Sequence, residues 1–588
     1  MLLAALLLSL SACPSFWETA ASREGECRPR EARCGPFVTA DDVSDDAEEN
    51  GPTPPSGAPP DGACSDGTRA SIQRYDIGID LRSGETSSCL WLDASTKGSR
   101  WVSVESAIPV QRLTWNGVPT DGCFDEGILN VRVDDASRTR PGRMCSSFTM
   151  PEQHPASDFG FTRTQDRHGN EFTYLRSWVE QCPVLGPCNP DPAQLVELRF
   201  QITHEAEQVV LCPGALTTQG TKTRCTLDTV RAPTYSGLFL AANPGWRRTS
   251  HTLSSDIRLH LHEVPGAGVL ETLDLARLDD FSSWITALLG ALPYGDDLRV
   301  ATAPMNWMGY EHPATILLNE RIREFPPEYE DMAMHTLLHE LVHQWAGNRT
   351  TLRHAQDFVW KEAIADYLVY VYEDEHMPPS TAKATLRTWD RLATFTPFYP
   401  VPEDDPPIPL ETTASSAYGT GSMILLLQLE DLLDRATILE AIRLFLASPG
   451  ARSVSDLKDA LQTASGADLQ RYFEAWIHGT GAPDWPFMRT QITQGATGPT
   501  LRIEQESLSG QAYPCVVEVA LETTTGPLVV SGVFALDQPD TVLEIPLTLD
   551  GSVTAIQVDP RHRLVNLPFP PAPSAASPWH HHVVALHP

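Results

Sequence analysis

The sequence predicts a multidomain α+β protein with an N-terminal antiparallel β domain, a mainly helical middle domain and a small C-terminal β-sandwich. In residues 69–248, short alternating runs of apolar and polar residues such as 75–81 and 195–202 are separated by Gly, Pro, Asn and Asp, a pattern typical of strands. Between about 270 and 480, apolar residues instead recur at helical spacing. Strand alternation returns from about 487 to 567, a length that suits one β-sandwich.

Length and charge limit the classes of partner. At about 100–200 residues per domain, several domains are expected from 588 residues. The 76 Asp and Glu exceed the 43 Lys and Arg, which gives a formal net charge of -33. A protein that grips phosphates needs a basic surface, and no element of this sequence carries a cluster of Lys or Arg. We therefore expect no nucleic-acid partner.

The first residues resemble a bacterial lipoprotein signal. The apolar run from Met1 to Ala12 is too short to span a bilayer, and it ends in Leu10-Ser11-Ala12-Cys13, which resembles a lipobox. We interpret residues 1–13 as this signal, with a lipid on Cys13 as the only membrane contact. The chain is then exported and anchored to a bacterial membrane, in the periplasm or at the cell surface. No Lys or Arg precedes the apolar run, so an ordinary secretory signal or a start further upstream are the alternatives.

Two segments are predicted to be disordered. Residues 14–68 combine acidic pairs with dense proline and few apolar residues, so they cannot bury enough surface to fold and form a tether. Residues 568–588 are proline-rich and include His580, His581 and His582, which we interpret as part of a flexible tail.

Cysteine usage supports export. Apart from Cys13, ten of the remaining eleven cysteines precede residue 226 without any CxxC pair, which favours disulfides over a zinc cluster. The connectivity does not follow from the sequence, although Cys182 and Cys188 are close enough to form a small loop. Cys515 stands alone and is expected to be a buried free thiol.

The strongest chemical signal is His339-Glu340-Leu341-Val342-His343. Pro326 and Pro327 can start a helix here, and Leu337, Leu338, Leu341, Val342 and Trp345 form its apolar stripe. Histidines at i and i+4 share one helix face, so both imidazoles can reach one metal ion. Glu340 lies beside them, where it can take a proton from a metal-bound water.

A third ligand follows in the next predicted helix. Asp357 can cap this helix, and Glu362 is separated from His343 by eighteen residues, enough for a turn and a return beside the first helix. Two histidines and one glutamate with a fourth position for water form the open geometry of catalytic zinc. We expect one Zn²⁺ per chain, held by His339, His343 and Glu362.

These motifs resemble the aminopeptidase N-like zinc metallopeptidases of the gluzincin type. His339 to Trp345, the eighteen-residue gap and Trp360-Lys361-Glu362-Ala363 look like the HExxHxW…E signature, with Lys361 and Ala363 departing from its usual Asn-Glu-Gly. The resemblance covers roughly residues 70–570. It implies a thermolysin-like zinc catalytic domain over residues 249–486, between a β domain at 69–248 and a sandwich at 487–567. It also implies a short form without the large C-terminal helical domain of many relatives.

The resemblance assigns further roles. Met308-Gly309-Tyr310-Glu311-His312-Pro313 looks like the exopeptidase motif of the family, and it places Glu311 on the glutamate that binds the α-amine of the substrate. Tyr418, followed by Gly419 and an apolar helix, resembles the tyrosine that stabilises the tetrahedral oxyanion. A second amine-binding residue would be Glu180 or Gln181, and the spacing does not decide between them.

The expected function is a zinc-dependent aminopeptidase acting on peptides with a free N-terminus. Glu340 serves as general base and then acid, Tyr418 stabilises the oxyanion, and Glu311 fixes the amine. The alternatives are a thermolysin-like zinc endopeptidase, which shares the ligand set, and a surface-tethered binding protein with an inactive peptidase fold.

Overall fold

The structure is a computed structural model. It describes residues 67–93, 101–133, 142–154, 157, 159–324, 331–394, 398–403, 420–495 and 498–570. The predicted signal, nearly all of the tether and most of the tail lie outside the described residues. None of the described helices is both long and apolar enough to cross a membrane.

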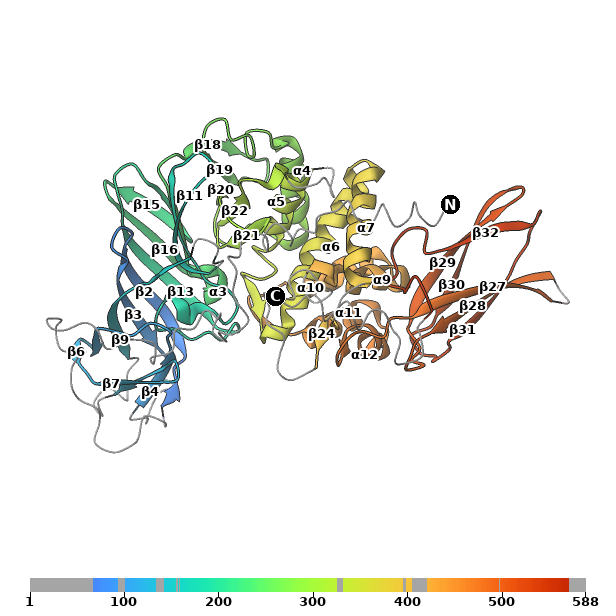
Figure 1. Cartoon of the computed structure of the whole chain (residues 1–588), viewed down its shortest axis with the longest axis horizontal. Coiled ribbons are helices and arrows are strands. Elements are labelled where there is room, and N and C mark those ends of the chain that lie inside the picture. Colours follow the sequence, from blue (N-terminus) through green and yellow to red (C-terminus); the bar gives the residue numbers. More distant parts are fainter. Residues whose placement is uncertain are drawn as a thin grey trace, which may run out of the picture. The chain divides into compact units, whose positions relative to one another are not determined.

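The N-terminal part of the described chain is built from β-strands, as expected (Figure 1). An eight-stranded sheet has the order β15-β16-β13-β2-β3-β9-β5-β6, with β2 Ile72–Asp80, β3 Glu85–Leu92, β5 Arg112–Trp115, β6 Val118–Pro119, β9 Arg143–Thr149, β13 Leu195–Thr203, β15 Ala215–Gln219 and β16 Lys222–Pro233. A four-stranded sheet has the order β1-β4-β8-β7, with β1 Thr68–Arg69, β4 Trp101–Glu105, β7 Gly122–Asp125 and β8 Ile128–Arg132. A five-stranded sheet has the order β10-β11-β12-β17-β14, with β10 Glu152–Gln153, β11 Gly160–Gln165, β12 Glu171–Arg176, β14 Val209–Leu211 and β17 Phe239–Asn243. The short helices η3 Cys182–Leu185 and α3 Thr234–Gly237 connect strands of this region.

The alternation of apolar and polar residues in the sequence corresponds to alternating buried and exposed side chains in these sheets. Along β13 every second side chain is buried, among them Val196, Leu198 and Phe200, while their neighbours are more exposed. Most strand pairs are antiparallel, but β13 runs parallel to β2, with Leu198 opposite Tyr75. The predicted antiparallel β domain therefore also contains parallel pairs.

Three disulfides join described residues of this region: Cys89–Cys145, Cys182–Cys188 and Cys212–Cys225. The first of them links directly opposite residues of β3 and β9. The small loop expected between Cys182 and Cys188 is confirmed.

A five-stranded sheet opens the region that was expected to be mainly helical. Its order is β18-β19-β20-β22-β21, with β18 Arg247–Thr252, β19 Arg258–Glu263, β20 Asp297–Ala303, β21 Gly309–His312 and β22 Thr315–Asn319. Helix α4, Leu275–Leu289, makes the crossover between the parallel strands β19 and β20. It begins where the Asp274 carboxylate accepts hydrogen bonds from the amides of Ala276 and Arg277. The short helix η4, Ile322–Glu324, follows β22.

Helices then dominate up to the C-terminal strands. They are α5 Met332–Val342, η5 Ala355–Asp357, α6 Phe358–His376, α7 Pro379–Thr394, η6 Thr420–Met423, α9 Ile424–Leu433, α10 Arg435–Phe445, α11 Val454–Ser465 and α12 Gln470–Trp476. Two short pairs of parallel strands connect loops between the helices. They are β23 Thr350–Leu352 with β25 Gly450–Arg452, and β24 Val401–Pro402 with β26 His478–Gly479. Helix α6 is buried on nearly all sides, so it is the central helix of this region.

The C-terminal strands form two three-stranded antiparallel sheets. One has the order β27-β28-β31, with β27 Phe487–Gly495, β28 Gly498–Glu506 and β31 Val542–Pro546. The other has the order β30-β29-β32, with β29 Cys515–Thr523, β30 Gly526–Phe534 and β32 Val553–Val558. Cys515 at the start of β29 is a buried free thiol, as expected, and burial raises its pKa.

Arg563, which follows β32, links the C-terminal strands to the helices through ion pairs and a hydrogen bond. Its guanidinium lies 3.0 Å from Glu430 Oε1 and 3.0 Å from Asp431 Oδ2, both on α9, and donates to Tyr370 Oη on α6 at 2.9 Å. The side chain is 6% exposed. Two carboxylates therefore compensate one buried cation.

We expect Arg563→Ala to lower the free energy of unfolding by about 1.5–3 kcal/mol, because it removes charged hydrogen bonds from the Glu430 and Asp431 carboxylates, which keep their contacts with Arg435 and Arg561. Urea denaturation followed by tryptophan fluorescence measures the change. The control is Arg443→Ala, which breaks a fully exposed pair with Glu440 on α10 and should leave the unfolding midpoint nearly unchanged. Equal shifts in the two variants would contradict a role for the buried network.

Candidate metal centre

Helix α5 carries the HExxH motif and is fixed by a cap and an apolar face. The Asp331 carboxylate accepts a hydrogen bond from the Met334 amide at 3.2 Å, which caps the first turn. The expected stripe of Leu337, Leu338, Leu341, Val342 and Trp345 is buried. Pro326 and Pro327, expected to start the helix, lie outside the described residues. Packing of the stripe turns His339 and Glu340 toward α6 and β21, and His343 continues the helical turn as the C-terminal cap.

Helix α6 carries Glu362, but Asp357 does not cap it in the expected way. The Asp357 side chain accepts from the His354 amide at 2.9 Å and from the Val454 amide at 2.8 Å, and it makes no capping bond to α6 itself. It completes the capping box of the short helix η5 and accepts a hydrogen bond from the first residue of α11 instead. Asp357 therefore stands at the N-cap position of α6, but the expected capping by its side chain is absent, because η5 runs directly into α6.

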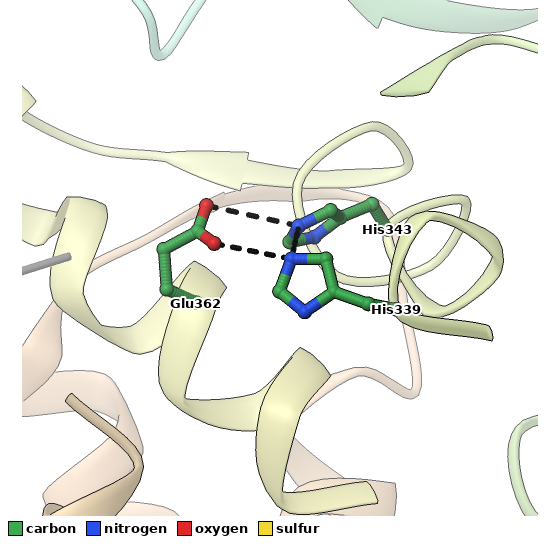
Figure 2. Close-up of side chains that lie close together, drawn as sticks. All are labelled: His339, His343 and Glu362. Atoms are coloured by element: carbon green, nitrogen blue, oxygen red, sulfur yellow. Dashed lines mark hydrogen bonds and ion pairs between the residues drawn. The ribbon is translucent and has the colours of Figure 1, made fainter. Parts of the chain in front are cut away.

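The three predicted ligands meet between the two helices (Figure 2). His339 Nε2 and His343 Nε2 are 2.9 Å apart. Glu362 Oε2 is 3.2 Å from His339 Nε2, and Glu362 Oε1 is 3.7 Å from His343 Nε2. Two nitrogens and a carboxylate thus face one point in space, which is the arrangement that a metal ion requires.

Both histidines are oriented by hydrogen bonds on their other ring nitrogen. His339 Nδ1 lies 2.6 Å from Asp366 Oδ1, and His343 Nδ1 lies 2.9 Å from the Ala346 carbonyl oxygen. Because a carbonyl oxygen can only accept, Nδ1 of His343 carries the proton and Nε2 keeps its lone pair. For His339, burial alone would lower the pKa, but the carboxylates of Asp366 and Glu362 raise it well above the usual value. The same negative surroundings favour a metal ion in place of the proton.

Glu340 and Glu362 lie in the same buried space with different charge preferences. Burial raises the pKa of Glu340 to about 8. Burial would also raise the pKa of Glu362, but Lys361 and the two histidines outweigh this effect and hold its pKa well below the usual value. Gly309 leaves room for Glu340, since a Cβ there would lie 2.4 Å from Glu340 Oε1. Glu362 therefore favours its charged form, whereas Glu340 favours its protonated form at neutral pH.

Glu311 joins this cluster from the sheet. It lies on β21, which pairs with β22 and packs against α5, and it forms a group of potential ligand atoms with Glu340 and His343. Its Oε1 is 3.2 Å from the Lys361 ammonium, which also lies 2.7 Å from Glu362 Oε1. The structure thus brings the predicted amine-binding carboxylate to the predicted metal ligands.

Two other predictions have different outcomes. Tyr418 lies outside the described residues. Glu180 is exposed as a residue, but partial burial of its carboxyl raises its pKa, and the charged groups that act on it are Glu105, Arg69 and Asp191 of the N-terminal region. Gln181 stands at the start of η3 and makes no capping bond through its side chain. The structure therefore gives no link between either Glu180 or Gln181 and the cluster.

The sequence interpretation missed three contributors to the site. Asp366 has a clear signal, because it follows Glu362 at i+4 and so shares its helix face. Lys361 was noticed only as a departure from the motif. Trp178, whose ring lies 5.7 Å from the Lys361 ammonium, carries no local signal, because a loop of the N-terminal region brings it there.

Comparisons with known proteins agree with this geometry. The profile of the peptidase family M1 domain matches residues 293–476. The Tricorn protease-interacting factor F2 of Thermoplasma volcanium is 26% identical over 166 residues, which cover 25% of this chain and 20% of that protein. The chain thus matches about a fifth of the length of this relative.

A solved structure shows the same fold over a longer span. The crystal structure of Legionella pneumophila aminopeptidase A in complex with aspartic acid superposes with a TM-score of 0.67 at 16% identity. The match covers 82% of this chain and 57% of that one. It includes the β-rich N-terminal part, the helices and the C-terminal strands. Residues 293–476 therefore form a peptidase family M1 domain, the domain of the aminopeptidase N-like metallopeptidases.

Proposed function

We propose that the chain is a zinc-dependent aminopeptidase that hydrolyses the first peptide bond of peptides with a free N-terminus. The observation that carries the proposal is the placement of one carboxylate, Glu311, in the same buried cluster as the His339, His343 and Glu362 ligand set. A metal centre alone suits any metallopeptidase. A carboxylate beside it is suited to an ammonium group and therefore favours an exopeptidase.

The ligand set fits zinc. Two imidazoles and one carboxylate are the ligands of many catalytic zinc sites. Each imidazole is also oriented by a hydrogen bond at its Nδ1, as is usual for histidine ligands of a metal. Ligand atoms about 2.0–2.1 Å from a tetrahedral ion lie about 3.3 Å from each other. The two Nε2 atoms, 2.9 Å apart, approach that spacing. Bound zinc would supply Lewis acidity to the scissile carbonyl and to a water molecule.

The roles of the protein groups follow from their positions. Glu340 accepts the proton of the attacking water and delivers it to the departing amine. Glu311 orients the substrate by binding its α-ammonium, so that the first peptide bond comes to the metal centre. Tyr418 is proposed to donate a hydrogen bond to the oxyanion, as the resemblance implies.

We expect the purified chain to hold about one zinc ion and to hydrolyse aminoacyl anilides, with loss of activity on chelation and recovery on adding zinc. Elemental analysis and a panel of aminoacyl substrates test this. The matched control is His343→Ala, which should lose both zinc and turnover. Stoichiometric zinc without turnover on any substrate would contradict the enzyme and favour a binding protein with a peptidase fold.

We also propose that the chain is exported and anchored through a lipid on Cys13. The three disulfides between described residues support an oxidising compartment, since cytosolic proteins rarely keep such bonds.

A further inference from the structure

Lys361 is a buried cation inside the cluster. Its side chain is 1% exposed, and its ammonium lies 2.7 Å from Glu362 Oε1, 3.2 Å from Glu311 Oε1 and 3.3 Å from His343 Nε2. The resident ammonium therefore forms an ion pair, without a hydrogen bond, with one oxygen of the carboxylate proposed to receive the substrate ammonium.

Neighbouring residues restrict the position of the Lys361 side chain. Gly347 has φ +128°, and a Cβ there would lie 2.9 Å from Lys361 Cε, so the stem of the lysine lies directly against the Gly347 backbone. The ammonium lies 5.7 Å from the ring centre of Trp178 and 5.2 Å from that of Phe358, both within the range of a cation–π contact. A side chain packed in this way keeps its charge at Glu311 and does not move freely to solvent.

Glu311 depends little on Lys361 for its position. It belongs to β21, where it pairs with Ile316 of β22, and its side chain is 3% exposed. Packing and the strand therefore restrict the carboxylate even without the lysine. The main effect of Lys361 on Glu311 is the positive charge.

We propose that Lys361 is a specificity-determining residue that weakens the binding of the substrate α-ammonium at Glu311. The inference rests on the proposed aminopeptidase function. With Oε1 facing Lys361, a substrate ammonium bound at Glu311 would share this carboxylate with the lysine, which brings two cations together in a buried site where like charges repel strongly. Substrates must then gain more of their affinity from the side chain and from the rest of the peptide than from the amine.

The test measures binding of an amine without a scissile bond. Isopentylamine and isopentyl alcohol are titrated calorimetrically into the zinc-loaded protein and into Lys361→Met, which keeps the length of the side chain and removes its charge. We expect the dissociation constant of the amine to fall at least about tenfold in Lys361→Met, and that of the alcohol to stay unchanged. Lys361→Arg, which keeps the charge, should remain within about threefold of the wild type.

The same measurement in the Glu311→Gln background separates the two hypotheses. Without the carboxylate the amine loses its anchor, so amine binding should be weak in Glu311→Gln, and Lys361→Met should improve it less than in the wild-type background. Unchanged or weaker amine binding in Lys361→Met would overturn the role of Lys361 while leaving the amine anchor intact. If wild type and Glu311→Gln bind the amine equally, the anchor itself fails, and the proposed function with it. Should Lys361→Met not fold, as judged by circular dichroism, Lys361→Gln gives the same readout.

Discussion

Glu340→Gln is expected to retain one zinc ion and to lose about 10²- to 10⁴-fold in kcat on aminoacyl anilides, the range typical for removal of a general base. The amide keeps the shape of the side chain but cannot accept the proton of the attacking water. Glu340 lies on α5, is buried against Gly309 and is not one of the three proposed ligands, so zinc content should not change. Steady-state kinetics and elemental analysis of the same preparation measure both quantities.

A matched control for this variant is Glu320→Gln. Glu320 is also a buried glutamate, but its carboxylate accepts hydrogen bonds from the Arg167 amide, away from the cluster. We expect kcat within about twofold of the wild type, since the amide oxygen can still accept from that amide. A Glu340→Gln variant that holds zinc and turns over at the wild-type rate would exclude Glu340 as the base.

Glu311→Gln is expected to reduce kcat/KM for substrates with a free amine by about 10- to 200-fold, because a charged hydrogen bond to the substrate ammonium is lost. N-acetylated peptides carry no ammonium, so their kcat/KM should not fall. The comparison uses one peptide sequence with and without the acetyl group, assayed by chromatography of the products.

This comparison also separates the aminopeptidase from a thermolysin-like endopeptidase. An endopeptidase does not depend on the amine, and it would cleave both peptides in the wild type. If Glu311→Gln lowers cleavage of both forms equally, Glu311 acts on the fold or the metal site and not on the amine. Zinc content of the variant then shows which of the two is affected.

Much of the fold could be predicted, because periodicity reports burial directly. The alternation in 75–81 and 195–202 became β2 and β13, and the apolar stripe around Leu337 became the buried face of α5. The five-stranded sheet β18 to β22 was not predicted. Along β20 and β22 almost every side chain is buried, so these strands show no alternation, and short apolar runs of this kind do not distinguish strand from helix.

The candidate site likewise contains parts that the sequence predicts and parts that it does not. His339 and His343 share a helix face by local geometry alone, and the position of Glu362 follows once two helices are assumed to pack. The contacts of Lys361 did not follow, because they join α6 to β21 and to a loop of the N-terminal region. No pattern along the chain encodes a contact between elements so far apart.

The sequence by itself therefore determined the ligand types, their spacing and the order of β-rich, helical and β-rich regions, since these depend on neighbours along the chain. Only the tertiary structure decided that Asp366 and the Ala346 carbonyl orient the two imidazoles, and that a buried lysine shares the carboxylate of Glu311. The physical reason is that hydrogen bonds and charges act over a few ångströms in space, and folding alone sets which groups come within that distance.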